Sequence, residues 1–237
     1  MAPIIQSARL ATGVRLDFVQ YGDPAGIPLL FLPGLADSWR SFEHVLPLLS
    51  KSIHAIAVTR PGHGAPDHPP ASHHVGDFAA DSMALLDTLG IHQAVIVGHS
   101  HGAVVARQLA VRHRDRVAGT VFVGLPSIAP EHRSATEHSL EHSREHGGTH
   151  HEVAVREISA ELNAITSPMM LMWGDADPHA AEIQRICDTT PEAIPVIYSG
   201  VGDALHCEDP ELFGSDLSIF AVLVARGPLS TSWNSPR

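Results

Sequence analysis

The residues with the clearest chemical potential are Gly98-His99-Ser100-His101-Gly102, which directly follow an apolar run at residues 94–97. A run with helical character, residues 103–110, comes immediately after them. Glycines two positions before and after Ser100 allow neighbouring chain segments to approach a sharp turn between a strand and a helix. The pattern predicts that Ser100 is a nucleophile, held at the start of a helix where a bound oxyanion is favoured.

Short apolar segments alternate along the chain with helical segments that would position this serine. Strands are expected at residues 14–20, 28–32, 53–58, 94–97, 120–123, 169–173 and 194–198. Helices are expected at residues 75–89, directly after Ser100, and at residues 210–225. Short strands made almost wholly of apolar residues, separated by helices, predict an α/β fold with a mostly parallel, doubly wound sheet covered on both faces.

The composition describes a globular protein with an acidic surface. The chain has 237 residues, of which 44% are hydrophobic, and a net charge of −11 with Lys51 as its single lysine. This charge argues against nucleic acid and anionic membranes as partners. No signal-peptide pattern or membrane-spanning run is visible, and Cys187 and Cys207 are expected as free thiols. A cytoplasmic location is therefore expected.

Five motifs together carry a resemblance to a known family. They are Leu32-Pro33-Gly34-Leu35-Ala36-Asp37-Ser38-Trp39, Arg60-Pro61-Gly62-His63-Gly64, Gly98-His99-Ser100-His101-Gly102, Trp173-Gly174-Asp175-Ala176-Asp177 and Glu208-Asp209-Pro210-Glu211. In this order they resemble the α/β-hydrolase superfamily over residues 5–225. The resemblance implies one α/β-hydrolase core, residues 1–126 and 168–226, and a short helical lid at residues 127–167. Residues 227–237 are expected to form a loose tail.

The resemblance also implies roles for individual residues. Ser100 would be the nucleophile, and the backbone N–H groups of His101 and Leu35 would form the oxyanion hole. The acid would be Asp177, with Asp175 as the alternative, while turn formation before a proline is the other interpretation of both aspartates.

The position of the general base departs from the family pattern. Relatives tend to read G-H-x-x-x-x-E-x-P, and counting back five residues from Glu208 reaches Asp203. A free Asp is less basic than a free His by about 2.6 pK units, and loss of a triad member costs on the order of 10⁴-fold in rate. Three interpretations stay open. Asp203 is a disabling substitution, the chain is a naturally non-catalytic or divergent member, or His206 acts as the alternative base.

The expected lid contains a histidine-rich tract. His138, His142 and His146 recur every four residues and would share one helical face, with glutamates alongside. The spacing fits the zinc-peptidase pattern H-x-x-E-H, but it repeats within a low-complexity segment. Metal binding by the lid is therefore an alternative to a solvated lid face, and no metal is expected at the serine site.

The sequence predicts a hydrolase that cleaves a small-molecule carboxylic ester or lactone through an acyl-Ser100 intermediate, with no cofactor. Trp39 and His99 are expected to line the substrate pocket, with packing in the core as the other interpretation. Serine at the elbow argues against epoxide and haloalkane chemistry, for which similar proteins use aspartate there. C–C bond hydrolysis and non-catalytic binding of a small molecule remain alternatives.

Overall fold

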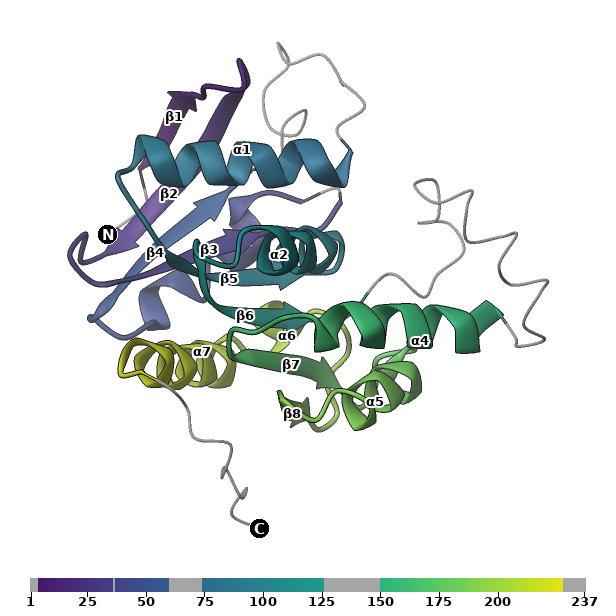
Figure 1. The fold of residues 1–237 in the computed structure, drawn as a ribbon. Helices are drawn as coiled ribbons and strands as arrows, with labels where there is room; N and C mark the ends of the chain where they lie inside the picture. Colours follow the sequence, from purple (N-terminus) through teal and green to yellow (C-terminus); the bar gives the residue numbers. More distant parts are fainter. Residues whose placement is uncertain (1–3, 36, 60–73, 126–149, 228–237) are drawn as a thin grey trace.

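A single sheet forms the centre of the molecule (Figure 1). The computed structural model describes residues 4–35, 37–59, 74–125 and 150–227. Within them the strands are β1 (Ile5–Arg9), β2 (Arg15–Gly22), β3 (Ile27–Leu32), β4 (Ile53–Val58), β5 (Ala94–His99), β6 (Val117–Val123), β7 (Met169–Gly174) and β8 (Ala193–Tyr198). They form an 8-stranded sheet of order β1-β2-β4-β3-β5-β6-β7-β8. Only the pairs β1–β2 and β2–β4 are antiparallel, so the expected mostly parallel sheet is confirmed.

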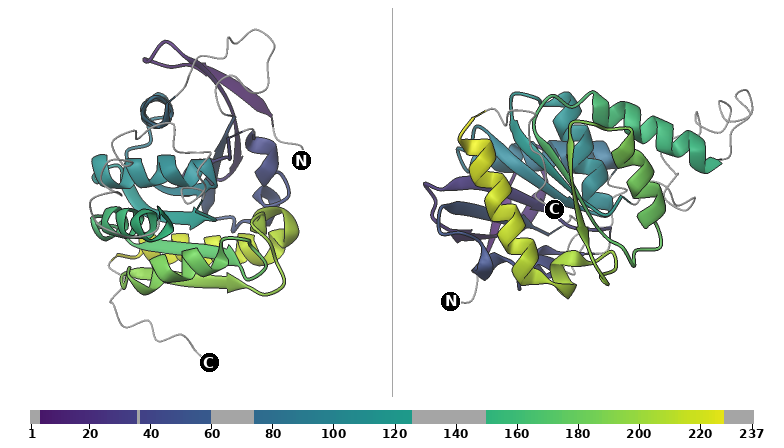
Figure 2. Two further views of the ribbon diagram at one scale, coloured as in Figure 1. Left: turned by 90° about the vertical axis from the view of Figure 1, so that its right-hand side faces the viewer. Right: turned by 90° about the horizontal axis from the view of Figure 1, so that it is seen from below.

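Helices cover both faces of the sheet (Figure 2). One face carries α1 (Val75–Thr88), α2 (His101–Arg112), α4 (His150–Asn163) and α5 (Ala180–Asp188). The other carries η1 (Trp39–Phe42), η2 (Leu46–Leu48), α6 (Leu205–Glu208) and α7 (Pro210–Ala225). Successive strand residues point to opposite faces, so each strand must be apolar on both sides. Leu30 accordingly packs in one buried cluster and its neighbour Phe31 in the other.

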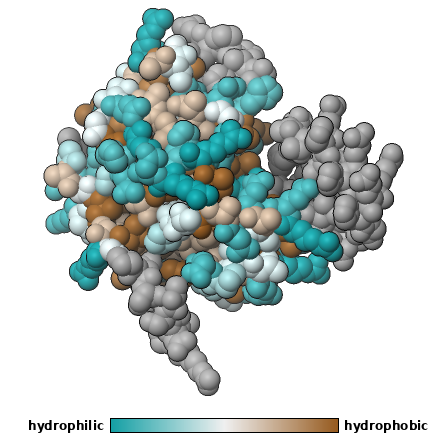
Figure 3. All heavy atoms as spheres, viewed as in Figure 1, coloured by the Kyte–Doolittle hydropathy of each residue, from teal (hydrophilic) through white to brown (hydrophobic). Residues whose placement is uncertain are grey.

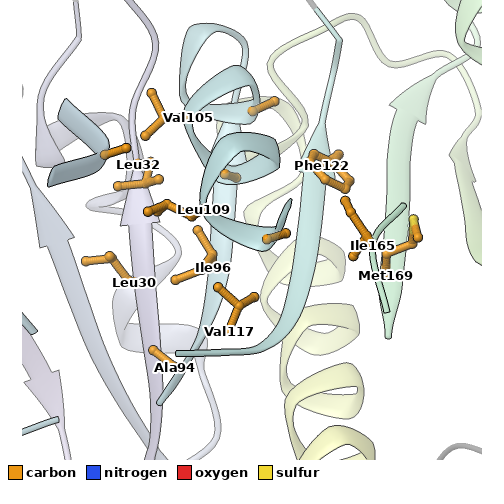
Figure 4. Close-up of a cluster of buried hydrophobic side chains, with 14 of the residues drawn as sticks. Leu30, Leu32, Ala94, Ile96, Val105, Leu109, Val117, Phe122, Ile165 and Met169 are labelled. Carbon is orange, nitrogen blue, oxygen red and sulfur yellow. The ribbon is translucent and has the colours of Figure 1, made fainter. Parts of the chain in front are cut away.

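The contact between α2 and the central strands fixes the position of Ser100. Figure 4 shows Val105 and Leu109 of α2 close to Leu32 and Ile96 of β3 and β5. All six residues of β5 are buried, which explains why this strand reads as a continuous apolar run. Strand and helix are therefore both held firmly, and the turn between them has little freedom.

The structure contains elements that the sequence did not predict. Strand β1 and helix α5 were not expected, and β6 begins at Val117 rather than at residue 120. Helix α4 falls inside the range expected for the lid, yet its Ile158 and Leu162 are buried in the core. The histidine tract of the lid and the expected tail beyond residue 227 lie outside the described residues, so both stay predictions.

The face of the molecule in Figure 3 is chemically mixed. Polar and apolar side chains alternate in small areas on the face shown in Figure 3. No helix in the described part of the chain combines the length and the apolar character needed to cross a bilayer.

Candidate active site

Ser100 occupies a strained turn between β5 and α2. Its backbone has φ 52° and ψ −119°, and no other non-glycine residue among those described has positive φ. The Ser100 N–H donates to the Val123 carbonyl oxygen (3.0 Å), and the Ser100 carbonyl accepts from the Ala103 N–H (2.8 Å). Such a conformation costs roughly 1–3 kcal/mol and persists only where its surroundings impose it. The strain therefore marks Ser100 as a functional candidate.

Packing explains both glycines of the motif. A Cβ at Gly98 would lie 2.7 Å from the Ala103 Cα, and a Cβ at Gly102 would overlap the carbonyl oxygen of Leu32. Real Cβ atoms do not approach backbone this closely, so the turn requires glycine at both positions. This agrees with the sequence-based expectation that glycines let neighbouring chains approach the turn.

The segment after β3 lies beside Ser100. A Cβ placed on Gly34 would be 3.7 Å from the Ser100 Cβ, 3.6 Å from the His99 Nδ1 and 3.7 Å from the Asp37 Oδ2. The next residue, Leu35, is 43% exposed. The two segments that carry the predicted oxyanion donors therefore meet at Ser100, while the donor roles of Leu35 and His101 stay predictions.

The two aspartates after β7 differ in their surroundings. Asp175 accepts hydrogen bonds from the Ser199 hydroxyl (3.0 Å) and the Gly200 N–H (2.6 Å), which ties it to the turn after β8. Asp177 is buried, and its Oδ1 accepts from the His179 N–H (2.7 Å). Its Oδ2 lies 4.0 Å from the Cβ position of Gly124, the residue that follows β6. This geometry favours Asp177 over Asp175 as the acid of the site.

Asp203, at the position expected for the general base, lies close to Gly124, as Asp177 does. Its carbonyl oxygen is 3.9 Å from the Cβ position of Gly124, and the residue is exposed. The preceding Gly202 N–H donates to both carboxylate oxygens of Glu208, each at 3.1 Å. Glu208 therefore fixes the loop that carries Asp203, and the structure brings Asp203 and Asp177 together at Gly124.

Two buried histidine rings, of His99 and His206, contact each other in a tilted arrangement. The His99 and His206 ring centroids are 4.4 Å apart, and the side chains are 8% and 1% exposed. Burial, and secondarily the nearby His99, lower the pKa of His206 to about 3. Burial also lowers the pKa of His99, although Asp203, Asp37 and Asp177 oppose that change. Both rings are therefore neutral at pH 7, and His206 is a very weak base.

Residues 27–146 match the model of a protein family that is described as "alpha/beta hydrolase fold". This stretch is just over half of the chain and contains the strained Ser100 turn. The chain belongs to the α/β-hydrolase family. The expected fold and family are thereby confirmed.

Individual relatives of this α/β hydrolase have different activities in their names. "Epoxide hydrolase A" of Mycobacterium tuberculosis is 37% identical over 123 residues, which are 49% of this chain and 37% of the relative. "2-hydroxymuconate semialdehyde hydrolase" of Pseudomonas sp. is 33% identical over 133 residues, which are 54% of this chain and 46% of the relative. The matched part spans less than half the length of these curated relatives.

Solved structures extend the likeness across the fold. The esterase RhEst1 from Rhodococcus sp. matches with a TM-score of 0.72 at 22% identity, over 94% of this chain and 100% of that one. The thioesterase domain from the curacin biosynthetic pathway matches with a TM-score of 0.73 at 18% identity, over 92% and 99%. At these identities the likeness concerns the fold alone.

The structure adds one residue to the predicted site of this α/β hydrolase and qualifies another. Asp37, which the sequence did not single out, faces His99 and Ser100 across Gly34. Its place inside the first family motif, three residues after Gly34, was a signal that went unused. Trp39 is buried in the core cluster, with the Arg40 guanidinium 5.0 Å from the centroid of its ring. A pocket-lining role for Trp39 stays a prediction.

Proposed function

We propose that this chain is a serine hydrolase that cleaves a carboxylic ester or lactone of a small molecule. The observation that carries the proposal is the strained backbone of Ser100 directly before α2, between two glycines that packing requires. Strain of this kind at an isolated serine, at the carboxyl edge of a parallel sheet, is typical of a nucleophile rather than of a structural residue.

The proposed reaction proceeds through two tetrahedral intermediates. The Ser100 Oγ attacks the substrate carbonyl carbon, and the carbonyl oxygen becomes an oxyanion that the N–H groups of His101 and Leu35 stabilise. Collapse breaks the ester C–O bond, the alcohol oxygen leaves with the proton that the base took from Ser100, and the acyl group stays on Ser100. Water then attacks the acyl-enzyme and releases the carboxylic acid.

The aspartate at the proposed position of the general base, Asp203, makes this reaction slow. Proton removal from the Ser100 hydroxyl would depend on Asp203, and a carboxylate is a poor base for an alcohol. What remains is the contribution of the oxyanion donors and of substrate binding, which in serine proteases without a triad member is about 10³–10⁴-fold over water.

A second candidate function is non-catalytic binding of a small molecule at the same site. Asp203 in the base slot and the neutral, weakly basic His206 favour it. Cleavage of a C–C bond, as the name of the Pseudomonas relative suggests for that protein, is a further outcome that the test below can detect.

The proposal is tested with a fluorophosphonate probe and a panel of p-nitrophenyl esters and aliphatic lactones. We expect covalent labelling at Ser100, located by peptide mass spectrometry, and slow turnover of short-chain esters. Ser100→Ala should abolish both. Labelling without turnover of any ester or lactone would favour the binding protein. No labelling of correctly folded protein would overturn the assignment of Ser100 as a nucleophile.

A further inference from the structure

Carboxylates approach Ser100 from two sides. Asp37 lies across Gly34, at the point where the Ser100 Cβ is 3.7 Å from the Gly34 Cβ position. The Asp177 carboxylate and the Asp203 backbone lie beside Gly124, which follows the residue whose carbonyl accepts the Ser100 N–H. The charges of both aspartates act on the neighbouring His99 ring. The reacting oxygen of Ser100 is thus set in an acidic surrounding built from the segments that follow β3, β7 and β8.

Three arginines in the described part of the chain form ion pairs with carboxylates outside this group. The ion pairs of Arg40, Arg107 and Arg116 in the described part of the chain go to Glu43, Glu161 and Asp87. The two histidines closest to the carboxylates are buried and neutral. The carboxylates of Asp203, Asp37 and Asp177 all act on the His99 ring in the direction that favours positive charge, so a cation beside this ring is favoured and an anionic substrate is repelled.

His99 supplies a second, independent sign of a ligand. The ring is more than nine-tenths buried, and among the described residues neither nitrogen meets the distance and angle limits of a hydrogen bond, although the backbone of Asp203 lies close enough to favour the protonated ring. Its Nδ1 points toward the Gly34 position, where the Asp37 Oδ2 and Ser100 also lie. A buried polar atom without a partner costs about 1–3 kcal/mol. A cationic ligand placed here would be attracted to the lone pair of the neutral imidazole, whether or not it has an N–H to donate.

The geometry points to a substrate with a cationic nitrogen, an ammonium group on the same small molecule as the ester or lactone carbonyl. The cation would lie between Asp37 and Asp203, above the neutral ring of His99, while the carbonyl faces the Ser100 Oγ. A metal ion fits less well, because no three His, Cys, Asp or Glu side chains in the described residues converge on one point. The inference rests on the proposed function only for the reacting serine.

The test uses a matched pair of probes that differ in charge but hardly in shape. Choline carries a trimethylammonium group, and 3,3-dimethylbutanol carries a tert-butyl group in its place. Binding of each to the Ser100→Ala variant is measured by NMR titration at 20 mM and 500 mM NaCl. We expect choline to bind about 10-fold more tightly at low salt, and the preference to shrink at high salt because exposed charges are screened.

Two carboxylate variants and a matched control locate the effect. Asp37→Asn and Asp203→Asn should each reduce the preference for choline about 3-fold or more. Asp115→Asn removes the same charge from an exposed turn at the opposite edge of the sheet and should leave the preference unchanged. Thermal melting of each variant confirms that it is folded.

The outcomes separate this inference from the proposed function. Equal binding of the two probes, or a preference for the neutral one, overturns the inference even where neutral esters are hydrolysed. An equal effect of Asp115→Asn and Asp37→Asn also overturns it, because net charge alone then explains the preference. A carboxylate-dependent preference for choline, in a protein that hydrolyses neither acetylcholine nor 3,3-dimethylbutyl acetate, upholds cation binding and rejects the hydrolase.

Discussion

Replacement of Asp203 by histidine should raise the esterase activity of this protein. The position is exposed, so an imidazole fits without displacing core side chains. The Asp177 carboxylate lies beside the same residue, Gly124, as the Asp203 backbone, with separations of 4.0 and 3.9 Å from its Cβ position. A carboxylate at this range can orient an imidazole and stabilise the imidazolium that forms when Ser100 loses its proton.

The size of the gain follows from the chemistry of the base. Histidine is more basic than aspartate by about 2.6 pK units and is largely unprotonated at pH 8. A positioned general base contributes about 10²–10⁴-fold to a rate. We therefore expect kcat/KM for p-nitrophenyl acetate to rise by about 10²–10⁴-fold in Asp203→His. The gain should grow with pH up to the imidazole pKa and then level off, because only the neutral ring accepts a proton.

Two companion variants assign the gain. Asp203→Asn removes the negative charge without adding a base, so any increase it shows measures the electrostatic part alone. The double variant Ser100→Ala/Asp203→His should be inactive, because a base is useful only with its nucleophile. A folded Asp203→His protein with the activity of the parent on every ester and lactone tested would refute the assignment of residue 203 to the base slot.

Three further substitutions test separate parts of the molecule. Gly102→Ala places a methyl group against the Leu32 carbonyl and should cost about 3 kcal/mol or more in the free energy of unfolding; urea unfolding within 1 kcal/mol of the parent would contradict the packing argument. In Gly34→Ala the added methyl group meets only ordinary contacts, with the Ser100 Cβ at 3.7 Å, so the melting temperature should stay near the parent value. Because the methyl group enters the space beside the nucleophile, kcat/KM should fall about 10-fold. Unchanged kinetics would place the substrate elsewhere. His206→Phe removes an imidazole whose pKa burial lowers to about 3. Below pH 6.5 the unfolded chain takes up a proton at His206 that the folded chain does not. The parent therefore loses up to about 1.4 kcal/mol of stability per pH unit on acidification. The variant should show a shallower loss in urea unfolding between pH 7.5 and 5, and parallel losses would argue against a buried neutral His206.

The sequence predicted the central elements of the fold because their burial leaves a continuous apolar signal. Strand β4 and helix α7 have the predicted bounds, and β3 differs by one residue. Strand β1 lies at the edge of the sheet with mostly exposed residues, so it carries no apolar pattern. Helix α5 is short, and its three buried residues are spread among polar ones. Both elements depend on tertiary contacts that local sequence does not record.

The serine turn was predictable for a different reason. Its glycines are required by backbone contacts within a few residues of Ser100, so the motif carries its own structural explanation. The surroundings of the turn are not local. Asp37 and the His99–His206 ring pair come together from the segments after β3, β5 and β8, and their arrangement depends on how three loops converge. Burial, which lowers the pKa of His206, is likewise a property of the folded chain.

These observations imply that the nucleophile and the base are under different physical constraints. A change at Gly98 or Gly102 forces overlap with backbone, so the turn persists in any folded version of this chain. Asp203 is exposed, and the loop that carries it is fixed by Glu208 through the Gly202 N–H rather than by its own side chain. A change of residue at 203 therefore costs little stability, whatever it does to the chemistry. The fold can thus retain a strained, complete serine turn after the base has been lost, and the Asp203→His experiment measures how much of the catalytic machinery the remaining residues preserve.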